Sequence, residues 1–152
     1  MTATTPQGWV VIQSLRDQLA GRVDPCQVYA CPPGDKDATA EVAWFGGVDS
    51  GSVEVPVLQD GRKQRNESVA GVLNVNIAGR SDLTSAQSRA IEVAAEFMDL
   101  FADDPTLGGL DGVYSSRVTS YSFDIVGTPD GPVAWAGVQF TVDVRLHCSE
   151  HP

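Results

Sequence analysis

The sequence offers three groups of side chains that could do chemistry or hold a partner. The first is a set of zinc-ligand types: His147, Cys148 and His151 near the C-terminus, and Cys26 and Cys31 far upstream. A structural zinc needs four such ligands in a tetrahedron. His147 and Cys148 end a predicted strand and His151 is next to the last residue, so their spacing favours free side chains over a metal site.

The second group is the acidic pair Asp103 and Asp104, which stands between a predicted helix and Pro105. Two carboxylates can work as acid and base only in a pocket whose other groups perturb their pKa values. No nucleophile elbow, phosphate-binding loop or zinc-protease motif accompanies the pair. We therefore expect a solvated turn at a helix end, and no catalytic, cofactor-binding or metal-binding residue in the chain.

The third group is the basic cluster of Arg62, Lys63 and Arg65. Such a cluster is either a solvated loop that aids solubility or a contact to an acidic partner surface. Residues 49–66 around it are rich in Gly and Pro, and a connection of this length is usually functional or disordered. We expect an extended loop or hairpin arm there, with the cluster touching a neighbouring subunit or another acidic protein.

Composition limits the classes of protein that the chain could be. It has 152 residues, 42% of them hydrophobic, and a net charge of −10. This fits one globular domain, and the negative charge argues against tight binding to DNA or to an anionic membrane. Three cysteines, no long apolar run and no signal-peptide pattern favour synthesis in a cytoplasm, with free thiols.

Two segments show the periodicity of amphipathic helices. Residues 7–20 place four apolar side chains on one face, and Gly21 is a natural end. Residues 81–103 carry a longer apolar stripe of alanines and aromatic residues. Thr84 followed by Gln87 predicts a capping box at the start of this second helix.

Five segments show the patterns of strands, and their order predicts the fold class. They cover residues 26–30, 41–48, 67–77, 114–125 and 138–147. Alternation along the last three favours a sheet with one buried face. We predict an α+β domain in the order α-β-β-β-α-β-β: a small, mostly antiparallel sheet packed by two helices. A turn is predicted at 127–132 and a loose C-terminal tail at 148–152.

The stretch D-P-T-L-G-G at 104–109 predicts a structural turn built from Asp104, Pro105, Leu107, Gly108 and Gly109. Pro105 ends the preceding helix, and the two glycines supply the backbone freedom to re-enter the sheet. Leu107 is then expected to tuck beneath the sheet as an apolar plug.

These stretches together resemble the tail terminator family of long-tailed phages. The likeness lies in the strand at 67–77, the alanine-containing helix at 85–101, the D-P-T-L-G-G turn and the alternating strand at 138–146. The N-terminal helix and the strand at 42–45 also follow the family order. The resemblance covers most of the chain and implies a single tail-terminator-like domain over residues 1–152.

The resemblance also implies a structural role in a virion. Such proteins form a hexameric ring on the end of the tail tube, stop its growth and present a joining surface to the head-completion (stopper) protein. DNA passes through the lumen, and no active site or cofactor is implied. A ring of such acidic chains would repel DNA phosphates and let the DNA slide through without specific binding.

Two other interpretations remain open from the sequence. The chain could be another neck or tail structural protein, such as a head–tail connector or a tail tube subunit, which would polymerise into long tubes. It could also be an unrelated small enzyme or binding module, which would need a concave pocket with converging polar groups.

Overall fold

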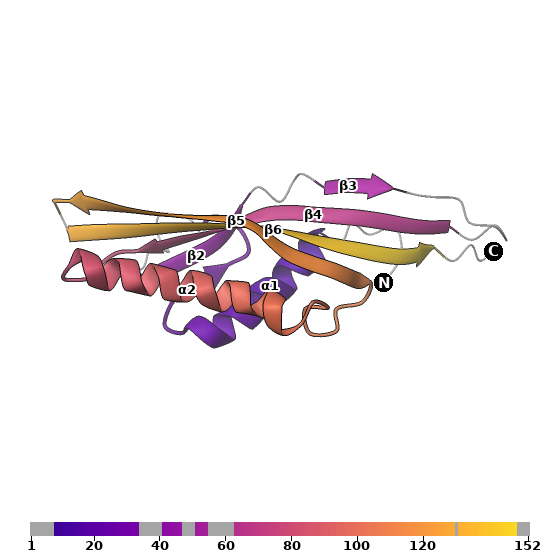
Figure 1. Ribbon diagram of the computed structural model, residues 1–152, viewed down its shortest axis with the longest axis horizontal. Helices are drawn as coiled ribbons and strands as arrows, with labels where there is room; N and C mark the ends of the chain where they lie inside the picture. The colour runs from indigo at the N-terminus through magenta and orange to yellow at the C-terminus, as the bar shows by residue number, and fades with distance from the viewer. Residues whose placement is uncertain (1–7, 34–40, 47–50, 55–62, 130, 149–152) are drawn as a thin grey trace.

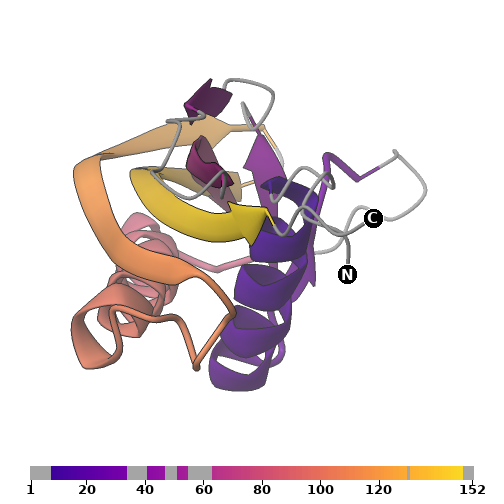
Figure 2. The ribbon, with the colours of Figure 1, turned by 90° about the vertical axis from the view of Figure 1, so that its right-hand side faces the viewer.

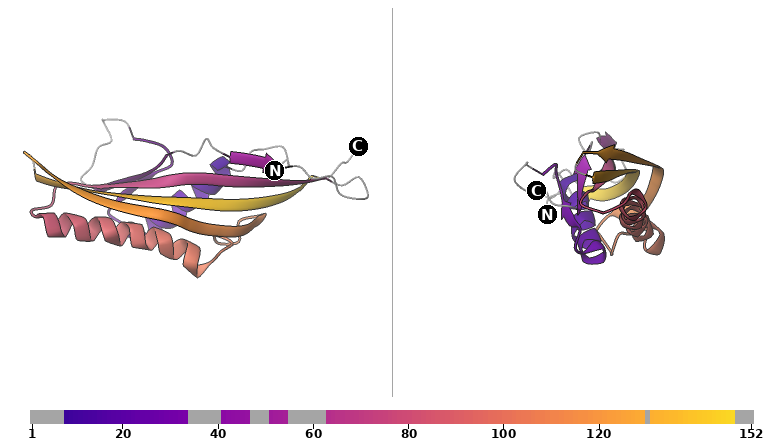
Figure 3. Two further views of the ribbon diagram at one scale, coloured as in Figure 1. Left: turned by 45° about the horizontal axis from the view of Figure 1, so that its top comes forward. Right: turned by 90° about the vertical axis from the view of Figure 1, so that its left-hand side faces the viewer.

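The computed structural model describes residues 8–33, 41–46, 51–54, 63–129 and 131–148; for 51–54, 63–65 and 146–148 it describes the backbone alone. Figure 1 shows a long twisted sheet with both helices beneath it. The views along the long axis in Figure 2 and in the right panel of Figure 3 confirm that the helices lie side by side on one face. The fold is therefore a two-layer α+β arrangement, as the sequence predicted.

The first helix, α1, spans Gly8–Val23 and therefore runs past Gly21, where the sequence predicted its end. Glycine inside a helix costs about 1 kcal/mol relative to alanine. Val23 is 1% exposed and joins Val11, Ile12, Leu15 and Leu19 in the core. Burial of the Val23 side chain outweighs the cost of placing Gly21 inside the helix.

The second helix, α2, spans Leu83–Asp103 and is capped by Asp82, not by the predicted Thr84–Gln87 box. Asp82 has an extended backbone (φ −141°, ψ 164°), and its carboxylate accepts a 2.6 Å hydrogen bond from the Ser85 amide. Thr84 already lies inside the helix. The capping prediction was wrong because an aspartate two residues earlier is at least as good a cap as threonine.

The sheet has six strands in the order β1-β2-β4-β6-β5, with β3 paired to β4 beside that path. The pair β1 and β2 is parallel and every other pair is antiparallel. The strands are β1 (Gln27–Tyr29), β2 (Glu41–Gly46), β3 (Gly51–Glu54), β4 (Lys63–Ile77), β5 (Val113–Thr128) and β6 (Gly131–Cys148). The predicted element order is confirmed, with β3 added.

Three strands are longer than predicted because backbone pairing continues where the side-chain alternation fades. β4 begins at Lys63 instead of residue 67. β6 begins at Gly131 instead of residue 138, and β5 runs to Thr128, so the predicted 127–132 turn shrinks to the link between them. β4 pairs with β6 along its whole length, from Lys63 opposite Cys148 to Ile77 opposite Ala134. Glycine and proline near a hairpin end therefore do not stop this ladder.

Part of segment 49–66 is a hairpin. β3 pairs with the beginning of β4, with Gly51 opposite Val69 and Glu54 opposite Asn66. Residues 49, 50 and 55–62 lie outside the described residues, as do residues 149–152 of the predicted tail. Figure 1 shows that this end of the sheet extends beyond both helices.

The core is centred on three phenylalanines from three different elements. Phe45 of β2, Phe97 of α2 and Phe140 of β6 are each at most 1% exposed. Their ring centroids lie 5.5 to 5.9 Å apart with interplanar angles of 64° to 90°. Edge-to-face pairs of this kind add about 0.5–1.5 kcal/mol beyond the burial of their surface. The cluster fixes α2 against the middle of the sheet.

A charged network ties the same helix to the edge of the sheet. Glu41 at the start of β2 accepts hydrogen bonds from Arg89 Nε (2.6 Å) and Arg80 Nη2 (2.7 Å). Arg89 also donates to the Val23 carbonyl at 2.6 Å and to Glu92 at 2.9 Å. Burial of Glu41 opposes ionisation, but the hydrogen bonds from Arg89 and Arg80 outweigh it and hold its pKa below the usual value.

Truncation of the central ring should be costly. We expect Phe97→Ala to lower the free energy of unfolding by about 3–5 kcal/mol, through lost burial and the cavity that remains. Ile91→Ala is the matched control, because Ile91 lies on the same helix but is 42% exposed; it should change stability by less than about 1 kcal/mol. Urea denaturation measures both, and similar losses would contradict this description of the core.

The Glu41 network should give stability a defined pH dependence. Because its folded pKa is depressed, its stabilisation is complete above the ordinary glutamate value of about 4.3 and is lost as the pH falls through the folded pKa. Glu41→Gln should remove about 3 kcal/mol at pH 7, since it leaves Arg89 buried without its carboxylate.

The control for this experiment is Glu92→Gln, because the Glu92 side chain is 64% exposed. Its loss should cost less than about 1 kcal/mol. Urea unfolding between pH 3 and pH 7 would test both variants. A Glu41→Gln protein with wild-type stability and wild-type acid sensitivity would show that the network contributes nothing.

Candidate functional site

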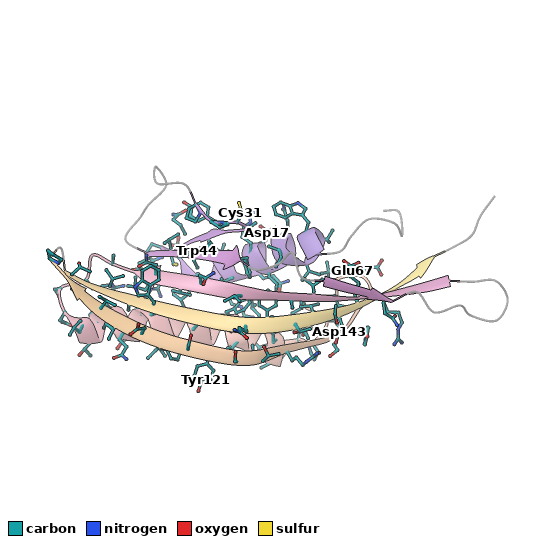
Figure 4. All side chains as sticks on the ribbon, turned by 90° about the horizontal axis from the view of Figure 1, so that it is seen from above. Asp17, Cys31, Trp44, Glu67, Tyr121 and Asp143 are labelled. Atoms are coloured by element: carbon teal, nitrogen blue, oxygen red, sulfur yellow. The ribbon has the colours of Figure 1, made fainter. Side chains whose placement is uncertain are left out.

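The sheet has one face that neither helix covers, which we call the open face. Most of its side chains are polar or small, whereas most side chains of the helix-covered face are apolar. On β4 and β6 its residues are Asn66, Ser68, Ala70, Val72, Asn74, Asn76, Trp135, Gly137, Gln139, Thr141, Asp143 and Arg145, of which Trp135 is 40% exposed. Figure 4 and the left panel of Figure 3 show the sheet over α2 with this face outward.

An ion pair organises the open face where the sheet extends past the helices. Asp143 of β6 accepts a short hydrogen bond from Ser68 Oγ and a 2.8 Å ion-pair contact from Arg117 of β5. Partial burial alone would raise the pKa of Asp143, but the hydrogen bonds from Ser68 and Arg117 lower it. Asp143 is therefore ionised at neutral pH, and its two contacts link β4, β6 and β5 across the sheet.

Arg145 stands beside this pair and is positioned by aromatic stacking. Its guanidinium lies 4.5 Å from the centroid of the Tyr114 ring, and its Nε donates to Asn66 at 3.4 Å. Its backbone amide donates to the Gly112 carbonyl at 2.7 Å. A stacked guanidinium with free edges can still donate to carboxylates of a partner. The open face thus presents two held arginines, Arg117 and Arg145, at one end.

A groove of about 310 Å³ lies on the same face near Arg117. It is lined by Ala70, Gly71, Val72, Thr119, Gln139, Phe140 and Thr141. None of these residues carries a side chain that ionises near neutral pH, so the groove offers no acid, base or metal ligand. Its lining is uncharged and combines small side chains with Gln139 and Phe140.

The 104–109 turn is held by a single carboxylate. Asp104 accepts hydrogen bonds from the Thr106 hydroxyl (2.6 Å), the Thr106 amide (2.9 Å) and the Gly108 amide (3.0 Å). These bonds, led by the one from the Thr106 hydroxyl, lower its pKa. Gly108 and Gly109 have φ of +79° and +80°, which favour glycine. Asp104 is therefore engaged in chain reversal, and the geometry assembles no acid–base pair with Asp103.

Leu107 lies at the tip of this turn and points into the core. It is 1% exposed and adopts φ 55°, a left-handed conformation that is rare for leucine. Its carbonyl accepts a 2.9 Å hydrogen bond from Gln18 of α1. The turn thereby joins the end of α2, the first helix and the core at one point.

The potential metal ligands do not converge where the structure describes them. Cys26 is buried, Cys31 is exposed, and both are free thiols. Burial, with a further contribution from Glu41, raises the pKa of Cys26 to about 11 and keeps it protonated. Among the described residues no three His, Cys, Asp or Glu side chains are grouped around a metal position. The side chains of His147 and Cys148, and all of His151, lie outside them.

The basic cluster falls at the end of the sheet that carries Arg117 and Arg145. Lys63 and Arg65 belong to β4, opposite Cys148 and Leu146 of β6. Arg62 and the side chains of Lys63 and Arg65 lie outside the described residues. The sequence did not single out Arg117 or Arg145, because each stands alone among polar residues; the sheet register brings them together.

The solvent side of α2 has the opposite charge. Glu92, Glu96, Asp99 and Asp103 follow one another at intervals of four, three and four residues, and the last turn contains no basic residue. Such spacing places them on one face of the helix. Arg22 of α1 contacts Glu96 at 3.7 Å and Asp103 at 3.3 Å. We call the surface formed by Glu92, Asp99 and Asp103 the acidic face of α2.

Comparisons with known proteins give likenesses among solved structures alone. No protein-family model and no curated protein matches the sequence. Among solved structures, a chain from the virion of a native gene transfer agent particle has a TM-score of 0.47 and 17% sequence identity, covering 90% of this chain and 92% of the other. A likeness at this level carries no argument about function. Neither described helix is long and apolar enough to cross a bilayer.

Replacement of the buried turn residue should destabilise the whole domain. Leu107→Asp places a carboxylate in a fully apolar site and should lower the free energy of unfolding by about 3–5 kcal/mol, or the melting temperature by about 10 °C. Leu83→Asp is the control, because Leu83 is 51% exposed and occupies the first turn of α2, where an acid is favourable. Thermal unfolding followed by circular dichroism distinguishes the two; an unchanged midpoint for Leu107→Asp would refute the plug.

Proposed function

We propose that this chain is a structural subunit of a phage-like virion, and that it acts as a tail terminator. In this role it assembles as a hexameric ring on the end of the tail tube, stops tube growth and offers the joining surface to the head-completion protein. The observation that carries the proposal is the open face: a long sheet, covered by helices on one side only, leaves an extended surface for contact with other proteins.

Three further features support a structural role. The order of elements and the D-P-T-L-G-G turn follow the pattern of the tail terminator family. The groove on the open face carries no ionisable side chain, and the Asp104 carboxylate is engaged in a turn. The net charge of −10 suits a ring through which DNA passes without being held. We propose no catalytic activity and no cofactor.

The proposed location is the neck or tail of a virion, after synthesis in the cytoplasm of a bacterial host. The partners are further copies of the chain, the tail tube protein and the head-completion protein. A second candidate is a tail tube subunit or a head–tail connector. It is favoured by the projection of β3, β4 and β6 past the helices (Figure 1), since long strands beyond a core could also build a tube wall.

Native mass spectrometry and negative-stain microscopy at several protein and salt concentrations separate these roles. A terminator should give a closed hexamer, alone or on added tail tubes, and should not extend. A tube subunit should give polymers of open length. A chain that remains monomeric at all concentrations, and that does not bind tube ends, would contradict both assignments.

The basic cluster gives a residue-level test. We expect the triple variant Arg62→Glu, Lys63→Glu and Arg65→Glu to block ring formation or tube capping, because the cluster is proposed to touch an adjacent subunit or the acidic rim of the tube. Arg16→Glu is the control, since Arg16 lies on α1 and pairs with its neighbour Asp17 at 2.6 Å. Intact, active rings from the triple variant would disprove this contact.

A further inference from the structure

We propose that the end of the open face that carries Arg117 and Arg145 docks onto the acidic face of α2 in a second copy of the chain. The inference rests on the proposed function, because it names the surfaces through which the copies would meet. It can be tested separately from the proposed function, since a ring could form through other surfaces of the chain.

The two arginines are arranged to receive carboxylates. Arg117 is fixed by Asp143 and Arg145 by Tyr114 and Asn66, and the Arg117 side chain is still 52% exposed. Each guanidinium has five N–H donors, more than these contacts use. Because the side chains are already held, little conformational entropy remains to be lost when a partner binds. The open face is thus preorganised for an anionic partner.

The acidic face of α2 carries more negative than positive charge in the isolated chain, although Glu92 and Asp103 are each paired with an arginine. Glu92, Asp99 and Asp103 lie on one side of a helix whose C-terminal end already carries partial negative charge. Acids one turn apart repel each other by a few tenths of a kcal/mol, and the last turn of α2 contains no basic residue. Arg22 contacts Glu96 and Asp103, and Arg89 contacts Glu92 while it is also paired with Glu41, so these two arginines offset only part of the negative charge. A cationic surface would relieve this repulsion.

One chain cannot bring the two surfaces together. The apolar stripe of α2 packs against the covered face of the sheet, so its acidic side points away from the sheet, whereas Arg117 and Arg145 lie on the open face. Figure 3 shows α2 and the open face on opposite sides of the molecule. A contact between these different patches is heterologous, and repetition of such a contact closes a ring if the rotation allows it. A second copy is the partner whose charge complements both patches.

The test uses two charge-reversed proteins. The sheet variant carries Arg117→Glu and Arg145→Glu, and the helix variant carries Glu92→Lys and Asp99→Lys. Each variant alone sets like charges against each other at the proposed contact. We expect the hexamer fraction of each to fall at least about tenfold in native mass spectrometry, since like-charge contacts at an interface cost several kcal/mol.

Mixing the two variants is the decisive measurement. The sheet variant has two negative surfaces and the helix variant has two positive ones, so each can bind only the other. A heterologous contact then predicts alternating hexamers with three copies of each variant, which native mass spectrometry identifies by mass. Circular dichroism and melting curves confirm that both variants fold. The control is a mixture of either variant with Arg16→Glu protein, in which the hexamers should contain Arg16→Glu chains alone and should not incorporate the charge-reversed variant.

The outcomes separate the inference from the proposed function. If the wild type forms hexamers and the reversed variants do so equally well, this contact is wrong and the proposed function stands. If the wild type forms no closed oligomer, with or without tube ends, both fail. If the sheet variant instead loses binding of duplex DNA that the wild type shows by fluorescence anisotropy, the arginines serve phosphates and the inference is overturned. Restored 3:3 hexamers in the mixture support it.

Discussion

The packing of α2 on the centre of the sheet is the contact on which the rest of the structure depends. Phe97 meets Phe45 and Phe140 there, so one helix is fixed to two strands that are distant in sequence. This contact buries one face of the sheet and, because the domain has only two layers, leaves the other face open. The same packing turns the acidic side of α2 outward. Both candidate interaction surfaces therefore follow from one apolar interface.

The polar contacts around this core fix the positions of the elements more than they add to the stability of the fold. Arg89 lies on the buried side of α2 and is itself buried. Its guanidinium donates hydrogen bonds to Glu41 and to the Val23 carbonyl. Asp104 gathers the donors of the following turn and so directs Leu107 back into the core. Buried ion pairs add little net stability compared with apolar packing, but an unpaired member is costly. Such contacts penalise alternative placements of α1, β2 and the turn.

The distribution of charge connects the fold to its proposed role. A net charge of −10 discourages self-association in general. Arg117 and Arg145 nevertheless lie at one end of the open face, and the acids lie along the opposite helix. An acidic chain with this asymmetry would associate in one orientation and would repel other approaches, as a ring subunit requires. The groove on the open face is lined by uncharged side chains.

Much of this protein follows from the sequence by itself. Periodicity located both helices and five strands, because one-sided burial imposes a repeat of 3.6 or 2 residues, and the glycines at 108–109 marked a turn that needs positive φ. The acidic charge and the element order suggested the structural role. Tertiary structure alone decided the rest. Burial of Val23 extends α1 beyond Gly21, and Asp82 is the N-cap of α2. Backbone pairing with β5 extends the start of β6 to Gly131. The Glu41–Arg89 pair and the Arg117–Arg145 surface join residues far apart in the chain, and only the sheet register and the packing of α2 bring such residues within reach of each other.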